Sequence, residues 1–285
     1  MENQVQQSAK NMSIKQLMSN DTIKQKFAEI LGKGSASFIS SVTTLATTSS
    51  LKDCDPMSIL SSAIAGASLN LPVNPNLGFA GIVPFNSKSG KQAQFQIMTK
   101  GFVQLAQRSG QFLKLNVCAS FEGDTEEQIK QRLFGIIPPI NKSEKIVGYV
   151  AGFVLVNGYE QFLFMTVDQI QKHGQKYSKT YNSATSIWKT NFEAMAEKTV
   201  LKRLLSKFAP LSLEMQTAVL ADQSKVKLDE NLDAVEFDYV DSVDVTVAEE
   251  ISENANKTTI EMPRKQPIVK EENIKSEDSD MPSFA

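Results

Sequence analysis

The sequence predicts an α+β domain in which an antiparallel sheet of β-hairpins packs against helices. Apolar residues recur at helical spacing through the first 70 positions, and two pairs of alternating segments then flank short polar turns. A long amphipathic stretch rich in Lys and Arg follows near position 200. The order helices, hairpin, helix, strand, hairpin, helix and long basic helix is typical of an α+β domain with an antiparallel sheet.

Three short helices are expected before the first strand. Asn20 or Asp21 is expected to cap the first helix, which ends at Gly32. Apolar residues at helical spacing around Phe38 define the second. Asp55, followed by a proline at the first helical position, starts the third.

The first hairpin is predicted to pair residues 79–85 with 92–98 across the polar turn NSKSGK. Alternation along the second strand separates its glutamines from its apolar residues, so we expect the glutamines on an exposed face. Thr99 is expected to cap the following helix and Gly110 to end it. The residues of this region that we single out as candidate contacts are Lys88, Lys91, Gln94, Gln96, Lys100, Gln104 and Arg108.

The second half of the body is predicted to begin with a strand over 113–121, whose alternating residues share one face: Leu113, Leu115, Val117, Ala119 and Phe121. A second hairpin follows, because 146–156 and 159–166 flank Asn157-Gly158, a strong turn signal.

Two helices and a linker then complete the basic part of the chain. Thr166 and Gln169 have the spacing of a capping box for a helix that reaches His173, which we expect to be a C-terminal cap residue. A linker over 174–186 precedes a long helix from Ser186 to about Phe208. The residues that we single out here as candidate contacts are Lys176, Tyr177, Lys179, Tyr181, Trp188, Lys189, Lys198, Lys202, Arg203 and Lys207.

Charge divides the chain into two parts, although its 285 residues have a net charge of only -2. Residues 229–285 hold 16 acids and five bases, a net charge of -11, whereas 1–228 hold 25 bases and 16 acids, a net charge of +9. We therefore expect a disordered N-terminus over 1–12 and a body over 13–222 that binds a polyanion. An acidic, mostly disordered tail follows over 223–285.

Three segments closely resemble the RecT family of phage single-strand annealing proteins. They are LNLPVNPNLGFAGIVPF, QAQFQIMTKGFVQLAQRSG, and a Trp followed after three residues by FEAMAEKTVLKRLLSKF. The similarity covers roughly 50–210 in recognisable order. It implies ATP-independent annealing of complementary DNA on a ring-shaped or helical homo-oligomer. It also implies a fold related to the phage Red-beta protein and to the eukaryotic annealing protein of recombination.

Individual residues match the family's motifs. Gln94, Gln96, Lys100 and Gly101 stand in the QFQxxxKG core, and Arg108 stands at the basic residue before Gly. Lys198 and Thr199 match the KT pair of the long helix, and Lys202 stands where many members have Arg. Lysine keeps the charge there but loses the bidentate fork of arginine.

The resemblance also implies partners. It implies binding of single-stranded DNA and of the annealed duplex, and a 5′ to 3′ exonuclease that generates the strands. We further expect a host single-stranded-DNA-binding protein as a partner and a phage or prophage gene acting in the bacterial cytoplasm. The sequence requires no cofactor, although Mg²⁺ bridging protein and phosphate is compatible with it. No stretch approaches the ~20 apolar residues of a membrane span.

An annealing protein has to hold one strand by its phosphates so that the base edges can test a second strand. Lys and Arg at helical spacing fit this task because they follow a backbone without reading its sequence. Together with the resemblance, this favours DNA contact for the candidate residues named above. The alternative to DNA contact, for each basic residue, is an ordinary solvated helix face. Trp188 is equally compatible with a core anchor and with a stacking platform, and Tyr177 and Tyr181 with base stacking and with surface packing.

Two other functions are weighed against annealing. The first is a protein that coats single-stranded DNA without pairing it. The second is a Mg²⁺-dependent nuclease, for which Asp53 with Asp55, or Glu122 with Asp124, are the close carboxylate pairs. Asp55 is explained by helix capping, and Glu122-Gly-Asp124 by a turn. No GxxxxGK[ST] loop is present, and His173 is the single histidine, which excludes a multi-histidine metal site.

The acidic tail carries two candidate interaction segments. AVEFDYVDSVDV at 234–245 alternates apolar and acidic residues, as a recognition strand does. The last ten residues, SEDSDMPSFA, resemble the acidic tip of bacterial single-stranded-DNA-binding proteins. The tail is expected to occupy the basic groove in the free protein, to recruit host replication factors, or to act as a solubilising segment.

Overall fold

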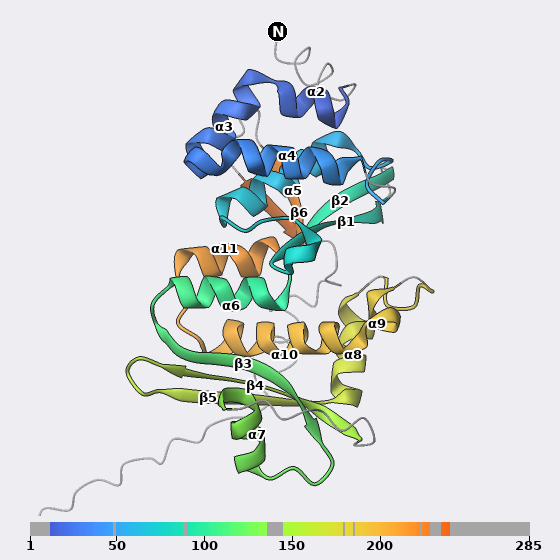
Figure 1. The fold of residues 1–285 in the computed structure, drawn as a ribbon. Helices are drawn as coiled ribbons and strands as arrows, with labels where there is room; N and C mark the ends of the chain where they lie inside the picture. Colours follow the sequence, from blue (N-terminus) through green and yellow to red (C-terminus); the bar gives the residue numbers. More distant parts are fainter. Residues whose placement is uncertain are drawn as a thin grey trace, which may run out of the picture. The chain divides into compact units, whose positions relative to one another are not determined.

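The computed structural model describes residues 12–47, 50–87, 90–135, 145–178, 180–184, 186–222, 224–228 and 235–239 (Figure 1). These residues belong to one compact unit, Met1–Val243. Helices and strands are both present, and every strand pair is antiparallel, so the predicted α+β class is confirmed. The strands of the described residues form three separate sheets, ordered β1-β2, β3-β4-β5 and β6-β7. None of the described helices is long and apolar enough to cross a membrane.

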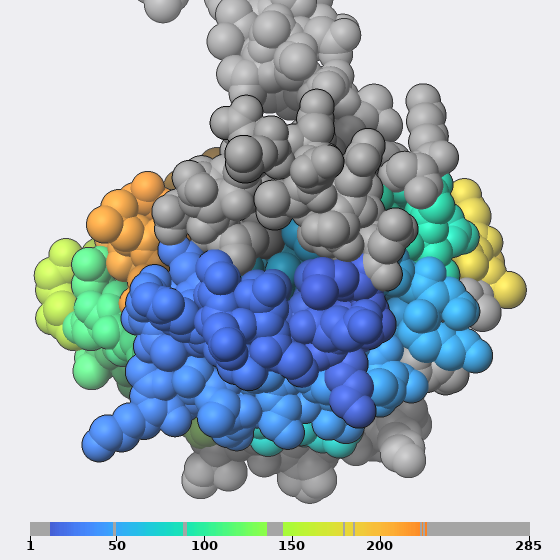
Figure 2. Space-filling model, turned by 90° about the horizontal axis from the view of Figure 1, so that it is seen from above, coloured from blue at the N-terminus to red at the C-terminus, as the bar shows by residue number. Residues whose placement is uncertain are grey.

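The N-terminal region is helical, as predicted, with one helix more than the sequence analysis expected. Its helices are α2 (Ile14–Ser19), α3 (Asp21–Leu31), α4 (Ser35–Ala46) and α5 (Pro56–Ser68), with the short 3-10 turn η1 (Gly32–Gly34) between α3 and α4. The unexpected helix is α2, which Ser13 and Gln16 start with a capping box. Asn20 caps α3 and Asp55 caps α5, as predicted. Figure 2 shows the blue N-terminal helices together on one face.

The first predicted hairpin is confirmed as β1 (Ala80–Ser87) and β2 (Gly90–Ile97), preceded by the 3-10 turn η2 (Pro75–Leu77). The helix α5 packs against β2, and β6 (Ser224–Leu228) contacts both elements. The helix α6 (Thr99–Arg108) begins directly after the hairpin. The prediction that Thr99 caps it is wrong: Met98 occupies the cap position, without a side-chain hydrogen bond, and Thr99 is already helical.

Gly101 allows α6 to start in contact with the hairpin. A Cβ atom at this position would lie 2.1 Å from the carbonyl oxygen of Phe79 and 2.8 Å from a methyl group of Ile97. The backbone of Phe79 is held in place because its carbonyl oxygen accepts the Met98 N–H at 2.9 Å. The KG pair of the resemblance therefore contains a glycine that packing requires.

We predict that Gly101→Ala lowers the free energy of unfolding by about 1–3 kcal/mol, because the backbone at Phe79 must move to admit the methyl group. Thermal unfolding followed by circular dichroism measures this loss. Gly34→Ala is the matched control, since a Cβ there meets nothing within 4 Å. Its effect should stay below about 1 kcal/mol. Equal effects of the two substitutions would contradict the packing role.

The three-stranded sheet consists of β3 (Phe112–Phe121), β4 (Ile146–Leu155) and β5 (Glu160–Thr166), which confirms the second predicted hairpin. The helix α7 (Glu126–Phe134), which the sequence analysis did not expect, packs against β3. The helix α10 (Phe192–Phe208) packs against all three strands (Figure 1). A register shift lies between Phe112 and Lys114, and Leu113 is 66% exposed, unlike Val117 and Phe121 of the face expected to contain it, which are buried.

The remaining elements are α8 (Val167–Tyr177), α9 (Ile187–Thr190), α11 (Leu213–Ala221) and β7 (Val235–Tyr239), which pairs with β6. The capping box of Thr166 and Gln169 is confirmed, but α8 continues past His173, which is therefore not a cap residue. Asn191 interrupts the predicted long helix, ending α9 and capping α10. Regular structure also extends beyond 222, the predicted end of the body. Residues 240–285 lie outside the described residues.

Candidate nucleic-acid interface

The predicted contact residues of the first hairpin do not form one exposed surface. Lys88 lies outside the described residues. The Lys91 ammonium lies 3.6 Å from the carboxylate of Asp53. Gln94 is only 3% exposed, so the prediction of an exposed glutamine is wrong, whereas Gln96 is half-buried. The reason is that β6 and α11 contact β2 in addition to α5, and they enclose the strand more fully than a lone hairpin.

The basic residues of α6 contact loops of the same chain. Lys100 is exposed, and its ammonium donates to the Leu77 carbonyl oxygen at 3.2 Å and lies 4.3 Å from the ring centre of Phe79. Gln104 is half-buried. Arg108 donates to the Leu69 carbonyl oxygen at 2.6 Å, and the same Nη2 atom lies 3.4 Å from the carboxylate of Glu214. Of these two cations, Arg108 is therefore the one with a carboxylate close to it.

A cluster of cations lies where α8 meets α10. It contains Lys176 of α8 with Lys202 and Arg203 of α10, around the single histidine, and we call it the α8–α10 cluster. The Arg203 Nη1 atom lies 3.5 Å from His173 Nδ1, and the ring centre of His173 lies 4.5 Å from that of Tyr177. Burial, together with the three cations, lowers the pKa of His173 to about 4. The imidazole is therefore neutral at pH 7.

Trp188, one of the candidate contacts, belongs to the hydrophobic core. Trp188 is 7% exposed, and its ring packs 5.5 Å from that of Tyr181 and 6.2 Å from that of Phe192. Of the two roles weighed for Trp188, the structure therefore shows the core anchor, and Tyr181 is half-buried against it. Lys179 lies outside the described residues.

Two more cations are exposed near the two ends of the α9–α10 segment. Lys189 of α9 donates to the Asn182 carbonyl oxygen at 3.0 Å. Lys207 of α10 lies 5.1 Å from the ring centre of Phe208 and one helical turn after Arg203. Because residues four apart are neighbours on a helix surface, Arg203 and Lys207 lie along the same side of α10. Both are exposed.

Lys198 is buried, which contradicts its predicted place on the exposed side of the helix. The residue is 5% exposed, and its ammonium donates to Oδ1 of Asp222 at 2.9 Å. Lys202 donates to Oδ2 of the same carboxylate at 2.8 Å, and the backbone N–H of Ile97 donates to Oδ1 at 2.9 Å. Asp222 is fully buried, and we call these three charged side chains the Asp222 triad. The sequence offered one weak signal for it, an acid directly after a short apolar helix.

The charge state of Asp222 follows from its neighbours. Burial by itself would raise the pKa of this carboxyl group, but the ammoniums of Lys198 and Lys202 and their hydrogen bonds hold it below its usual range. The Asp222 triad thus joins three parts of the chain: the end of α11, the helix α10, and the last residue of β2 just before α6.

The carboxylates considered for a nuclease have structural partners. Asp53 pairs with Lys91, and Asp55 accepts the Ser58 N–H at 2.9 Å as a helix cap. Asp124 binds both terminal nitrogens of Arg132, at 2.7 and 2.9 Å. Within the described part of the chain, no group of three or more His, Cys, Asp or Glu side chains could hold a metal ion.

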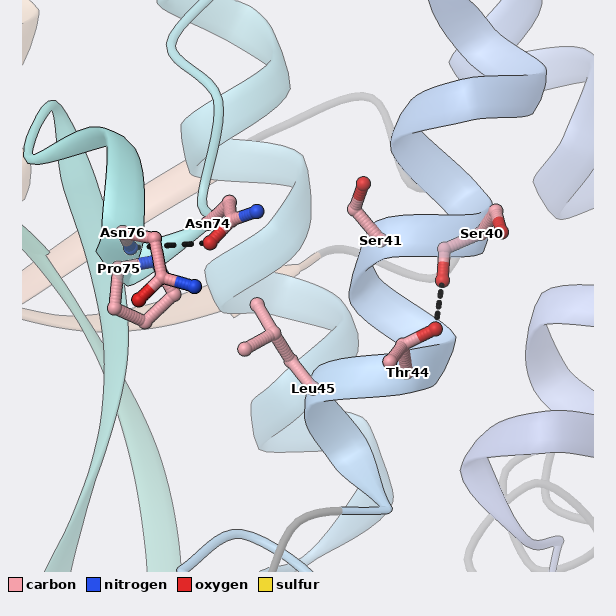
Figure 3. A pocket seen from close by; sticks show the side chains of 7 residues that line it. All are labelled: Ser40, Ser41, Thr44, Leu45, Asn74, Pro75 and Asn76. Atoms are coloured by element: carbon pink, nitrogen blue, oxygen red, sulfur yellow. Dashed lines mark hydrogen bonds between the residues drawn. The ribbon is translucent and has the colours of Figure 1, made fainter.

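A cavity of about 440 Å³ lies between α4 and the loop around η2 (Figure 3). Its lining consists of Ser40, Ser41, Thr44, Leu45, Asn74, Pro75 and Asn76. The Thr44 hydroxyl donates to the Ser40 carbonyl oxygen at 2.9 Å, and the Asn74 side chain accepts the Asn76 N–H at 3.0 Å. Because none of the described residues that line it is charged, this lining does not provide the phosphate neutralisation that a DNA strand requires.

Glu197 is an acid that is poorly solvated in the folded protein. Burial, and then the neighbouring carboxylate of Glu193, raise its pKa to about 7. The folded protein therefore takes up a proton at pH values where the unfolded chain has already lost it. As a consequence, the free energy of unfolding decreases as the pH rises from about 4.5 to about 7.

We predict that Glu197→Gln stabilises the protein by about 1–2 kcal/mol near pH 8, because the neutral amide avoids the desolvated charge, with partial exposure limiting the gain. Near pH 5 the two proteins should differ little, since Glu197 is then protonated in the fold. Urea unfolding at the two pH values measures the difference. A gain that does not depend on pH would contradict this explanation.

The family model described as the RecT family matches residues 36–236 of this chain. The uncharacterized protein YqaK of Bacillus subtilis (strain 168) is 36% identical over 257 residues, which cover 85% of this chain and 86% of YqaK. Protein RecT of Escherichia coli (strain K12) is 35% identical over 182 residues, which cover 61% of this chain and 66% of that protein. The matched region contains the α8–α10 cluster and the Asp222 triad, and the chain belongs to the RecT family.

Proposed function

We propose that this protein anneals complementary DNA strands without nucleotide hydrolysis, as a homo-oligomer that holds one strand on the α8–α10 cluster. Membership of the RecT family supports a single-strand annealing protein of recombination that binds single-stranded DNA and oligomerises. In this proposal the protein makes and breaks no covalent bond. It neutralises phosphate repulsion and aligns two strands, which lowers the barrier to pairing.

The α8–α10 cluster is the observation that carries the proposal. Lys176, Lys202 and Arg203 all lie near His173, whose imidazole is neutral at pH 7 and adds no charge to the cluster. Lys207 extends the same positive side of α10 by one turn. A row of cations suits a strand that is held by its phosphates with the base edges left accessible.

Other predicted contacts take different places in this proposal. Lys100 and Lys189 are exposed, and we propose them as further phosphate contacts. Four half-buried residues are proposed as less accessible contacts: Gln96, Gln104, Tyr177 and Tyr181. Lys91 and Arg108 have acidic partners and contribute less net charge. We propose structural roles for Gln94, Trp188 and Lys198 because they are buried. Lys88 and Lys179 remain predictions.

The assembly and the partners are proposed on the strength of family membership. We propose a ring or helical filament of subunits, a fold related to that of Red-beta, and a protein-held duplex as the intermediate of pairing. We also propose a 5′ to 3′ exonuclease and a host single-stranded-DNA-binding protein as partners, and a phage or prophage origin in a bacterial cytoplasm. No cofactor is needed for a mechanism based on charge neutralisation, and weak Mg²⁺ bridging to phosphate is compatible with it.

Annealing of complementary oligonucleotides, mixed with the protein in the absence of nucleotide, tests the proposed function. Acceleration of pairing with intact strands is the result that we expect. Inhibition of pairing would instead indicate a protein that only coats single strands, and cleavage would indicate a nuclease. Analytical ultracentrifugation with and without oligonucleotide tests the proposed oligomer.

The acidic segment provides a separate prediction. Residues 240–285 hold 11 acids and five bases, a net charge of -6. If this segment competes with DNA for the cations, its deletion should raise the affinity for single-stranded DNA and steepen the salt dependence. The deletion should begin after Tyr239, so that β7 remains paired with β6. Unchanged binding, measured by fluorescence anisotropy, would eliminate the competition.

A further inference from the structure

The two edge strands of the three-stranded sheet, β3 and β5, differ in how their outward backbone groups are satisfied. On β3 the Val117 N–H donates to Asn116 Oδ1 at 2.9 Å. The Phe121 N–H donates to the Asp124 carboxylate at 2.6 Å, and α7 packs against the same strand. Side chains and a covering helix are common ways of protecting a sheet edge from pairing with another chain.

The edge of β5 is open. The Leu155 N–H donates to the Tyr159 carbonyl oxygen at 2.8 Å, and in an antiparallel ladder such pairs alternate with pairs whose backbone groups point away from each other. By the register of β4 and β5, Glu160, Phe162 and Phe164 belong to pairs of the second kind, so their backbone groups point away from β4. Within the described part of the chain, these outward groups have no partner, apart from the Phe162 carbonyl oxygen.

That carbonyl oxygen is not closed to a further donor. It accepts from Gln161 Nε2 of the same strand at 3.1 Å, and a backbone carbonyl has two lone pairs. The whole outward edge from Glu160 to Phe164 is therefore able to take part in a new ladder.

An exposed apolar surface lies beside the same edge. Phe164 is 46% exposed, and its ring covers Gly148, where a Cβ atom would lie 2.5 Å from the ring. Phe162 is half-buried, with its ring centre 6.0 Å from that of Phe134. Residues two apart on a strand share a face, so both phenylalanines lie on one side of β5. An added strand would satisfy the open edge and cover the exposed ring together.

We propose that β5 pairs antiparallel with β5 of a second copy of this chain, centred on Phe162. In this register Phe162 lies opposite its own equivalent, and Glu160 lies opposite Phe164 of the second copy. Every outward N–H then meets an outward C=O, because the order of outward groups is the same from either end of the strand. This inference rests on the homo-oligomer of the proposed function, which membership of the RecT family supports.

The pairing joins two three-stranded sheets into one continuous sheet. A two-fold contact uses the same surface on both subunits and closes on itself, so a ring or filament would be built from such pairs through a second surface.

Hydrogen–deuterium exchange of the unmodified protein without DNA tests the pairing. The Phe162 and Phe164 amides should exchange freely in dilute protein and slow by at least about 10-fold as the protein concentration rises. The Phe121 amide, bonded to Asp124, is the internal control and should not respond. Protection that does not depend on concentration would assign the edge to another segment of the same chain and overturn the inference. Free exchange at every concentration would overturn it as well.

Two substitutions of Phe164 test the register. Phe164→Glu places a like charge opposite Glu160 of the second copy, whereas Phe164→Lys places the opposite charge there. Both remove the same ring from the same exposed position, so their effects on the fold are matched. The concentration of half-protection should be about 10-fold higher for the Glu variant, because the repulsion occurs twice in each pair of subunits.

Adding Glu160→Lys to Phe164→Glu should restore most of the lost association, since the opposed charges then attract. Equal half-protection concentrations for the Glu and Lys variants would overturn the proposed register and the pairing with it. These measurements contain no DNA, so their result is separate from that of the annealing assay. Annealing by a wild-type protein whose β5 stays unprotected would overturn this inference alone, and protection of β5 without annealing would overturn only the proposed function.

Discussion

Replacing Asp222 with Ala is expected to lower the free energy of unfolding by about 3–5 kcal/mol, because it leaves the buried Lys198 ammonium without its carboxylate. The Ile97 N–H loses its acceptor in the same variant. An unsatisfied buried donor adds about 1–3 kcal/mol of desolvation cost where water cannot reach it. Urea unfolding followed by circular dichroism measures the sum of these losses.

Asp168→Ala is the control for this experiment. Asp168 forms an equally short ion pair with Lys172, at 2.8 Å, but both side chains are about 70% exposed. Its loss should cost less than about 1 kcal/mol, since water replaces the partner. If Asp222→Ala cost no more than Asp168→Ala, the Asp222 triad would not be the structural link between α10, α11 and β2 that the geometry indicates.

Removing three charges from the α8–α10 cluster should have the largest effect on DNA binding. The variant combines Lys176→Gln, Lys202→Gln and Arg203→Gln. With about 0.7 in slope for each phosphate contact, the salt slope should fall by about 2 and the affinity for single-stranded DNA near 0.15 M salt by about 50-fold. Fluorescence anisotropy with homopolymers of different base, titrated at several salt concentrations, measures both quantities.

The control triple variant removes the same net charge from elsewhere, by Lys24→Gln, Lys130→Gln and Lys145→Gln. Each of these lysines is at least half exposed and has a carboxylate within 4 Å. We expect a loss of less than about 5-fold for this variant, because long-range charge is screened within about 8 Å at physiological salt. Equal losses in the two triple variants would show that total charge, and not the cluster, determines binding.

Local signals in the sequence predicted the regular elements well. Asn20 and Asp55 cap their helices, and Thr166 forms its capping box with Gln169, because each signal depends on residues within one helical turn. The Asn157-Gly158 turn joins β4 and β5 as predicted, because a tight turn also depends on neighbouring residues alone. The break between α9 and α10 at Asn191 was not predicted from the composition of this stretch.

Burial of polar residues could not be predicted, because it depends on contacts between distant segments. Lys198 matches a family motif on a basic helix, and its burial depends on Asp222, 24 positions later. Asp222 in turn accepts from Ile97, 125 positions earlier. Gln94 alternates correctly with its apolar neighbours and is nevertheless covered. Helical spacing places residues on a side of a helix but does not reveal what the fold packs against that side.

The candidate site was predicted in part. Lys176, Lys202 and Arg203 were candidates for phosphate contacts, and the structure brings these three together. The sequence analysis ended α8 at His173 and assigned Lys176 and Tyr177 to a linker, so it missed the helix that positions them. Asp222 was missed altogether, because its partners become apparent only in the fold.

The proposed function requires that the α8–α10 cluster holds the DNA strand during annealing. Its most direct test is the rate at which the Lys176, Lys202 and Arg203 triple variant pairs complementary oligonucleotides without nucleotide, relative to the wild type and to the control triple variant. We expect the wild-type protein to accelerate pairing, the control variant to do so almost as well, and the cluster variant to give a rate close to that of protein-free DNA. Full acceleration by a folded cluster variant would contradict it.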